Sequence, residues 1–191
     1  MRAWRIAGTV AWIACVCIVG SLLMPSASSA ATAQAIDTAA NKTLDQFRTQ
    51  VKGGAEFLRG AKGVLVFPEV IQAGIGIGGE YGEGVLRVKD RSVAYYSIKA
   101  GSIGFQLGAQ RKSILVVFLQ DQALKKFRDT ARTDKSWQVG VDGSVTLLNL
   151  GAQASINSGT VNQPIVGFVF GQQGLMYNLS LQGSKVSKIQ R

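Results

Sequence analysis

Apolar residues recur every three or four positions across residues 32–51, which is the spacing of one face of a helix. The residues on that face are Ile36, Ala40, Leu44, Phe47 and Val51. Asp37 in the first turn and Arg48 near the end agree with the helix dipole, and Gly53-Gly54 ends the pattern. The sequence therefore predicts a long N-terminal helix, followed by a short helical turn over residues 56–59.

From Gly63 the pattern changes to the alternation that is typical of strands. Residues 89–91 form a short polar stretch between two alternating runs, which predicts a hairpin. The run 114–119 is apolar at every position, as expected of a strand buried on both faces. The predicted strands of this part are residues 64–67, 70–79, 84–88, 92–98, 101–110 and 114–119.

A second helix is predicted over residues 121–131, with Asp121 as its N-cap and with Leu124, Phe127 and Ala131 on its inner face. Short strands separated by glycine-rich and asparagine-rich turns follow, at residues 137–141, 144–148, 151–156, 165–170 and 175–181. We expect an α+β domain: an antiparallel β-sandwich or partly closed barrel with a long N-terminal helix and one further helix packed on it.

Two of the predicted strands alternate glycine with bulky apolar residues, so one side of each strand carries no side chain. A strand of this kind marks a place where something approaches the backbone closely. The N-terminal helix, an acyl chain or another ligand are the alternatives. A dinucleotide is excluded, because no helix follows the G-x-G-x-x-G spacing. The glycines are Gly74, Gly76, Gly78, Gly101, Gly104 and Gly108.

The first 30 residues have the organisation of a cleavable signal peptide. Arg2 and Arg5 precede an apolar run over residues 6–24, and small residues follow up to Ala30. Cleavage after Ala30 would leave one domain, residues 31–191, in the periplasm or outside the cell and peripheral to a membrane; an uncleaved membrane anchor is the alternative. Cys15 and Cys17 both lie in the apolar run, so we expect no disulfide in the domain.

The chain contains no histidine, which excludes Ser-His-Asp catalysis and histidine-ligated zinc. Glu80 and Glu83 resemble a carboxylate pair. In a strand, however, they would tend to opposite faces, and we expect them at a solvated loop edge. An enzyme that uses Glu80, Glu83 or Tyr81 is therefore the least favoured hypothesis, and no cofactor or metal is expected.

The formal net charge is +10, and loss of Arg2 and Arg5 would leave +8. Such an excess favours anionic partners, among which export makes nucleic acid the least expected. The first group of candidate binding residues belongs to the N-terminal helical region: Lys42, Arg48, Lys52, Arg59 and Lys62. The second is the densest basic patch, at the second helix: Lys125, Lys126, Arg128, Arg132 and Lys135. A merely solvated helix face is the alternative for this patch.

Several segments together resemble the SYLF-domain family, over roughly residues 35–186. They are residues 61–68, 73–86, 104–110, 114–118, 174–175 and 180–183. The resemblance implies a lipid-binding module. SYLF domains of eukaryotes bind phosphoinositides, partly through an amphipathic N-terminal helix and basic residues, and some bind actin. Neither ligand is expected in an exported protein.

These observations predict non-catalytic binding of anionic phospholipid at a bacterial membrane surface, through the two basic groups named above. Apolar insertion by Phe47, Phe57 or Leu58 would add to the electrostatic attraction. The glycine strands would let the N-terminal helix lie close to the sheet or admit an acyl chain. The alternative is a structural or adaptor protein that docks an acidic protein partner.

Overall fold

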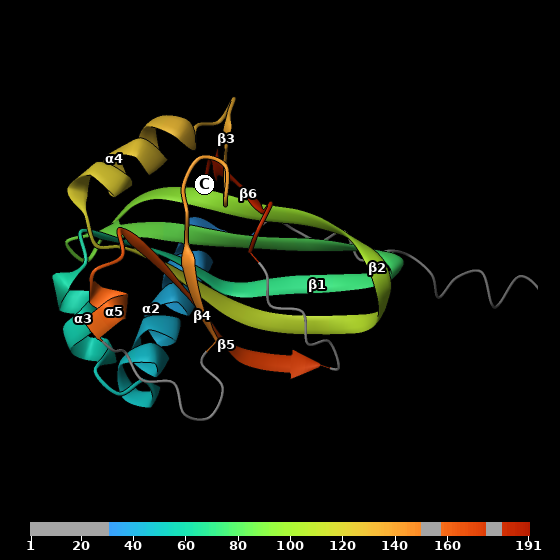
Figure 1. Cartoon of the computed structure of the whole chain (residues 1–191), viewed down its shortest axis with the longest axis horizontal. Coiled ribbons are helices and arrows are strands. Elements are labelled where there is room, and N and C mark those ends of the chain that lie inside the picture. Colours follow the sequence, from blue (N-terminus) through green and yellow to red (C-terminus); the bar gives the residue numbers. More distant parts are fainter. Residues whose placement is uncertain (1–30, 150–157, 175–180) are drawn as a thin grey trace, which may run out of the picture. The chain divides into compact units, whose positions relative to one another are not determined.

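The computed structural model describes residues 31–149, 158–174 and 181–191. The predicted signal peptide, the predicted strand 151–156 and most of the predicted strand 175–181 lie outside these residues. No helix in the described part of the chain is both long enough and apolar enough to cross a membrane. The helices are α2 (Ala33–Gln50), α3 (Gly54–Gly60), α4 (Asp121–Thr130) and α5 (Ser158–Val161); the strands are β1 (Gly63–Val88), β2 (Arg91–Phe118), β3 (Ser136–Gln138), β4 (Thr146–Asn149), β5 (Ile165–Gly174) and β6 (Lys185–Ile189) (Figure 1).

Six of the predicted strands join into two long ones, β1 and β2, which pair antiparallel along their whole length. The ladder begins with Val88 opposite Arg91 and ends with Gly63 opposite Phe118. Lys89 and Asp90 connect the strands with φ values of 50° and 61°. Two positive φ values in succession are the geometry of a type I′ hairpin turn, so the predicted hairpin is confirmed.

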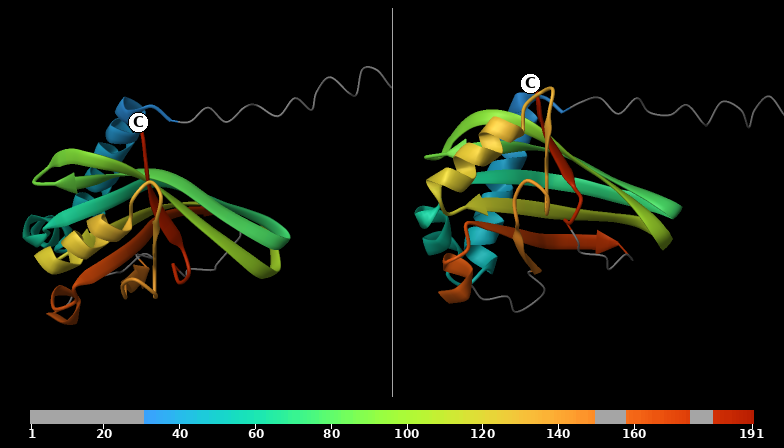
Figure 2. Two further views of the ribbon diagram at one scale, coloured as in Figure 1. Left: turned by 90° about the horizontal axis from the view of Figure 1, so that it is seen from above. Right: turned by 45° about the horizontal axis from the view of Figure 1, so that its top comes forward.

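The β1–β2 ribbon doubles back on itself at the first glycine-rich stretch. A Cβ atom on Gly74 would lie only 2.3 Å from the Cα atom of Gly78, four residues later. β1 follows the inside of this bend, and β2 follows the longer outside path. Ile75 pairs with Leu107 and Ile77 with Ile103, so β2 carries additional residues there. We call residues 63–75 with 107–118 arm I, and residues 77–88 with 91–103 arm II (Figure 2).

Each arm continues the sheet with its own neighbours. In arm I, β2 pairs with β5 and β5 with β4; in arm II, β2 pairs with β6 and β6 with β3. Among the described residues this is one curled six-stranded sheet that forms a half-barrel, so the predicted α+β class and the partly closed barrel are confirmed. The β4–β5 pair is parallel, which makes the sheet mixed. Residues 171–174, predicted as a turn, end β5, and β6 was not predicted.

α2 and α3 cover one face of the sheet, which we call the α2 face. The Phe47 ring lies 4.8 Å from that of Phe168, and the Phe57 ring lies 5.4 Å from it. Phe47 is fully buried, Phe57 is 5% exposed, and Leu58 packs partly buried against the same cluster. The predicted insertion of these side chains into a membrane is therefore wrong in this fold, since each buried Phe contributes roughly 1.5–3 kcal/mol to the core.

α4 covers part of the opposite face, the α4 face. Its Phe127 ring packs within 5.3 Å of the rings of Tyr96, Phe118 and Trp137. The apolar run of β2 divides between the faces: Ile114, Val116 and Phe118 point to α4, and Leu115 and Val117 point to α2. The prediction of a strand buried on both faces is confirmed.

The helix termini differ from expectation at two acidic residues. Thr32 caps α2 by accepting a hydrogen bond from the Ala35 amide at 3.2 Å. Asp37 lies beyond the first turn and accepts hydrogen bonds from Ser92 at 2.7 Å and Tyr95 at 2.9 Å, which fastens α2 to arm II. In α4 the N-cap position belongs to Gln120, and Asp121 lies in the first turn, where its charge favours the helix dipole.

Candidate functional site

A groove of about 1170 Å³ runs between α4 and the end of arm II that carries the hairpin turn. Its floor is apolar: Val88, Val93, Ala94, Tyr96 and Leu124. Val93 remains 44% exposed there, whereas Tyr96 is buried beneath Phe127. The pKa of Tyr96 is raised, because burial raises it more than the nearby charge of Arg128 lowers it. Tyr96 is therefore a neutral part of the floor.

Basic side chains surround this floor. The cations that line the groove are Lys62, Lys89, Lys125, Arg128, Arg132 and Lys188, and the acids are Asp121, Asp129 and Asp134. Two cations have partners: Lys62 lies 3.8 Å from Asp121, and Lys125 lies 3.7 Å from Asp129. Both pairs are exposed and therefore contribute little. Arg128 and Arg132 form no ion pair with another described residue, so both can bind an external anion.

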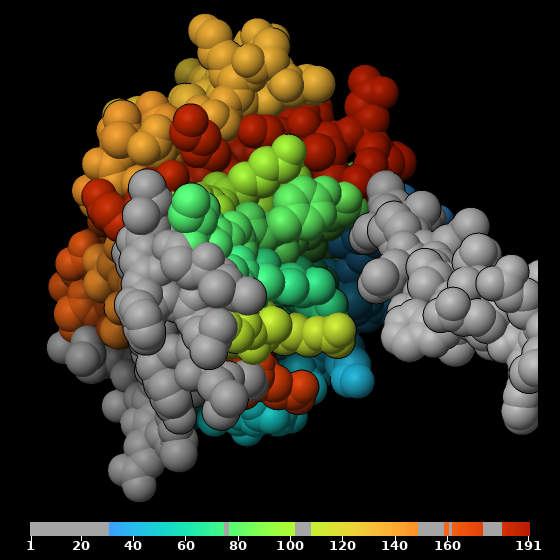
Figure 3. All heavy atoms as spheres, turned by 90° about the vertical axis from the view of Figure 1, so that its right-hand side faces the viewer, coloured from blue at the N-terminus to red at the C-terminus, as the bar shows by residue number. Residues whose placement is uncertain are grey.

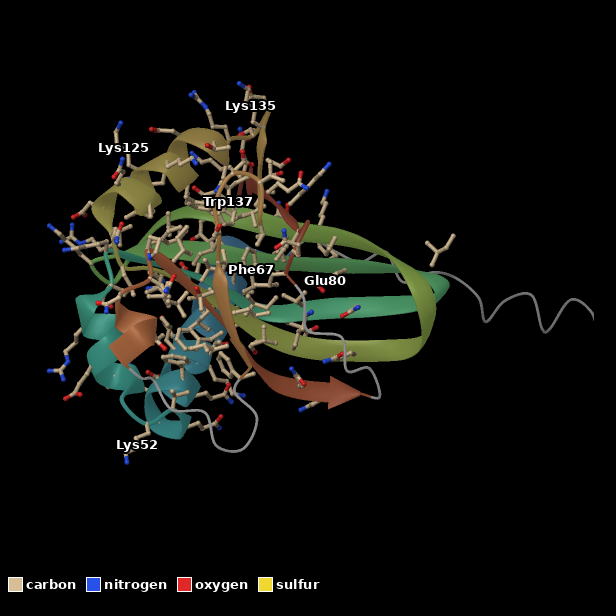
Figure 4. All side chains as sticks on the ribbon, in the orientation of Figure 1. Lys52, Phe67, Glu80, Lys125, Lys135 and Trp137 are labelled. Atoms are coloured by element: carbon tan, nitrogen blue, oxygen red, sulfur yellow. The ribbon has the colours of Figure 1, made fainter. Side chains whose placement is uncertain are left out.

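The structure divides the basic patch predicted at the second helix. Lys125, Arg128 and Arg132 follow helical spacing and line the groove. Lys126 points to the other side of α4, where it lines a separate pocket of about 320 Å³. Lys135 is exposed beyond α4, at the start of β3, and lines neither pocket (Figure 4).

The basic residues of α2 and α3 lie elsewhere. Arg48 and Arg59 line a second groove of about 280 Å³. Each has an acidic partner on its own helix: Asp45 lies 2.9 Å from Arg48, and Glu56 lies 3.5 Å from Arg59.

Lys42 and Lys52 are exposed and line neither groove. Figure 4 shows Lys52 and Lys125 on opposite sides of the sheet at the helical end of the domain. Of the ten predicted residues, the structure therefore gathers Lys62, Lys125, Arg128 and Arg132 around the first groove.

Two groove cations were missed at the sequence level. Lys89 belongs to the hairpin turn, whose position was predicted, and it lines both grooves. Lys188 belongs to β6, which has no clear alternation, so no sequence signal pointed to it.

The glycine strands pack the ribbon against itself. Gly74 and Gly78 meet inside the bend, while Gly101 faces open space and Gly108 has a φ of 138°, which favours glycine. Gly76 and Gly104 lie outside the residues whose surroundings are described. α2 packs on Val64, Val66 and Val85, away from the bend, so the expectation that these glycines admit α2 is wrong.

Glu80 and Glu83 do point to opposite faces, but neither is a solvated loop edge. Glu80 is buried on the α4 face, where its Oε2 atom lies 2.7 Å from the Nζ atom of Lys112. Glu83 pairs with Arg191 and accepts a hydrogen bond from the Tyr81 hydroxyl at 2.6 Å. Burial and this hydrogen bond raise the pKa of Tyr81 to about 12. Among the described residues no group of three or more acidic side chains is arranged to hold a metal ion.

A comparison with known families gives a match over part of the chain. Residues 99–191, which contain most of β2, α4 and β6, match the Ysc84 family model, described as "Las17-binding protein actin regulator". Among curated proteins, none matches the chain. The matched segment supplies Arg128, Arg132 and Lys188 of the groove. This match over residues 99–191 agrees with the resemblance of the sequence to the SYLF-domain family, to which the Ysc84 domain corresponds.

Proposed function

We propose that this protein binds anionic phospholipid at a bacterial membrane surface, without catalysis, as a peripheral protein of the periplasm or the cell exterior. The observation that carries the proposal is the groove between α4 and arm II, which we call the α4 groove. Six cations line its apolar floor, and four of them form no ion pair with another described residue. Phosphate would bind at Arg128 and Arg132, and the apolar floor around Val93 would contact the glycerol and upper acyl region of the lipid.

The electrostatic part needs several cations together. A Lys or Arg near an anionic membrane contributes roughly 1 kcal/mol, and the attraction falls off within a Debye length. Six cations against three acids line the groove. Phe47 and Phe57 are buried in the core and do not reach a membrane. The proposed binding therefore depends on electrostatic attraction at the groove rather than on insertion of these side chains.

The family supports binding over catalysis, since its description names a binding activity. That description concerns a protein partner, and it favours a second candidate function: docking of an acidic protein partner at the same cationic groove. The predicted export argues against Las17 or actin as that partner. The following experiment separates the two candidates, because a protein-docking groove needs no affinity for lipid.

The first prediction concerns cosedimentation with liposomes that contain or lack phosphatidylglycerol, at low and raised salt. We expect binding to the anionic liposomes alone, weakened by salt. The double variant Arg128→Glu/Arg132→Glu should bind at least about tenfold more weakly, because two attractive charges become repulsive. Lys42→Glu/Lys52→Glu carries the same charge change outside both grooves and serves as the control.

Absence of binding to anionic liposomes at low salt would rule out the lipid function. Equal losses in the groove variant and in the control would show that total charge, and not the groove, determines binding.

A further inference from the structure

Large apolar side chains lie exposed around the bend of the β1–β2 ribbon. Ile71 is 43%, Ile77 74% and Tyr81 46% exposed. By strand alternation Ile71 and Tyr81 belong to the α2 face, but α2 packs nearer the other end, on Val64 and Val66. Ile71 and Tyr81 thus lie on a part of the α2 face that none of the described helices covers.

The two arms bring these side chains to the same level. A Cβ atom on Gly82 would lie 2.8 Å from the carbonyl oxygen of Glu69 and 2.7 Å from the Val70 side chain. The residues next to this contact, Ile71 in arm I and Tyr81 in arm II, therefore lie at matching positions along the arms. Ile77 lies between them in the chain, at the bend itself.

Cations flank the apolar residues on the same face. The Lys99 ammonium lies 5.8 Å from the centre of the Tyr81 ring. Lys185 in β6 is the cross-strand neighbour of Lys99. Arg111 is the cross-strand neighbour of Ile71, with Glu69 3.8 Å away. A second ion pair, Arg191 with Glu83, lies beside Tyr81. Among the described residues, four cations thus stand against two acids, which makes this surface complementary to an anionic partner.

The bend and the α4 groove lie at opposite ends of the two arms. The groove lies where α4 and the hairpin turn meet, whereas the bend projects away from the helices (Figure 1). Figure 3 looks onto the bend end, where atoms of β1 and β2 reach the surface. The groove also opens on the α4 face, whereas Ile71 and Tyr81 lie on the α2 face, so the two surfaces face different ways.

We propose that the bend is a second lipid-contacting surface and that the protein bridges two anionic membrane surfaces. This inference rests on the proposed function, which supplies the contact at the groove. Ile71 and Ile77 would enter the boundary between headgroups and acyl chains, and Tyr81 would lie at headgroup level. Lys99, Lys185 and Arg111 would extend to the phosphates. Ile77 is 74% exposed at the bend, so its side chain can enter a fluid lipid surface that rearranges around it.

The test is clustering of phosphatidylglycerol-containing vesicles by the purified protein, followed by turbidity and dynamic light scattering. The wild-type protein should cluster the vesicles. Ile71→Ser/Ile77→Ser should cluster them about tenfold less, because the apolar contribution of two isoleucines is lost, yet should cosediment within about twofold of wild type. Val141→Ser is the matched control, since Val141 is 72% exposed and lies outside the bend.

The result that overturns the inference is binding of vesicles by the wild type without clustering, or undiminished clustering by the double variant. Equal loss in Val141→Ser, or dimers of the free protein that disappear in the double variant, would also overturn it. A wild type that does not cosediment with anionic vesicles would instead refute the proposed function itself, so cosedimentation of the wild type distinguishes the two failures.

Discussion

Lys112 and Glu80 form an ion pair inside the bent sheet, with side chains only 1% and 6% exposed. Gln72 contributes a further contact at 3.4 Å from the Lys112 nitrogen. Neither the Oε1 atom of Glu80 nor the side-chain amide of Gln110 has a hydrogen-bond partner among the described residues. Removing two charges from water costs several kcal/mol per ion, and this pair offsets that cost only while both partners remain.

Replacing one partner should therefore be more harmful than replacing both. We expect Lys112→Met to lower the free energy of unfolding by about 3–5 kcal/mol, because it leaves Glu80 charged, buried and unpaired. Lys112→Met/Glu80→Leu should recover much of that loss, as measured by urea denaturation. A double variant no more stable than the single one would show that the pair itself stabilises the fold.

At the scale of elements, the bend depends on glycines that let β1 lie against itself. A Cβ atom on Gly84 would lie 2.2 Å from the carbonyl oxygen of Val66, a backbone atom that no rotamer change can move away. Gly101, in β2, has nothing within 4 Å of the same position. The two glycines therefore differ in what they do, although both occur in glycine-rich strands.

We expect Gly84→Ala to destabilise the protein by about 1–3 kcal/mol or more, through forced separation of the arms. Gly101→Ala is the control and should change stability by less than about 1 kcal/mol, since its surroundings are open. Thermal unfolding followed by circular dichroism measures both. Similar effects of the two substitutions would contradict a close approach at Gly84.

Both long helices and the doubly buried run of β2 could be predicted, because helical spacing and an unbroken apolar run are local signals. The bend could not, because alternation continues through it and the sequence of β1 reads the same whether the strand is straight or folded. β6 was missed because Lys185, Ser187 and Lys188 leave little apolar pattern. The burial of Glu80 depends on Lys112, 32 residues away, so no local pattern indicates it.

At the scale of the whole molecule, Glu83 joins distant parts of the chain. Its carboxylate pairs with Arg191, accepts the Tyr81 hydroxyl and accepts a hydrogen bond from the backbone of Ala31. Burial alone would raise the pKa of Glu83. The hydrogen bonds from Arg191 and Tyr81, the charge of Arg191 and the Ala31 amide together lower it below its ordinary value of 4.5.

A carboxyl group whose pKa is lower in the folded state stabilises the fold above its unfolded pKa, and this stabilisation is lost as the pH falls through the folded pKa. Glu83→Gln should therefore lower stability by about 1.5–3 kcal/mol at pH 7, and the difference from wild type should shrink below about pH 4.5.

Glu69→Gln, at an exposed ion pair with Arg111, is the control for this experiment and should have little effect at either pH. Urea denaturation at pH 7 and pH 3.5 measures the differences. A difference between Glu83→Gln and wild type that stays constant with pH would contradict the role assigned to Glu83.

The type I′ turn at Lys89–Asp90 has a consequence for the order in which the chain folds. Pairing can begin at Val88 and Arg91, which are separated by only the two turn residues, and extend along arm II with little loss of chain entropy at each step. Arm I pairs Gly63 with Phe118 and forms only when the ribbon passes its glycine bend. We therefore expect arm II to nucleate folding, with the glycines of the bend controlling how quickly the remainder of the sheet assembles.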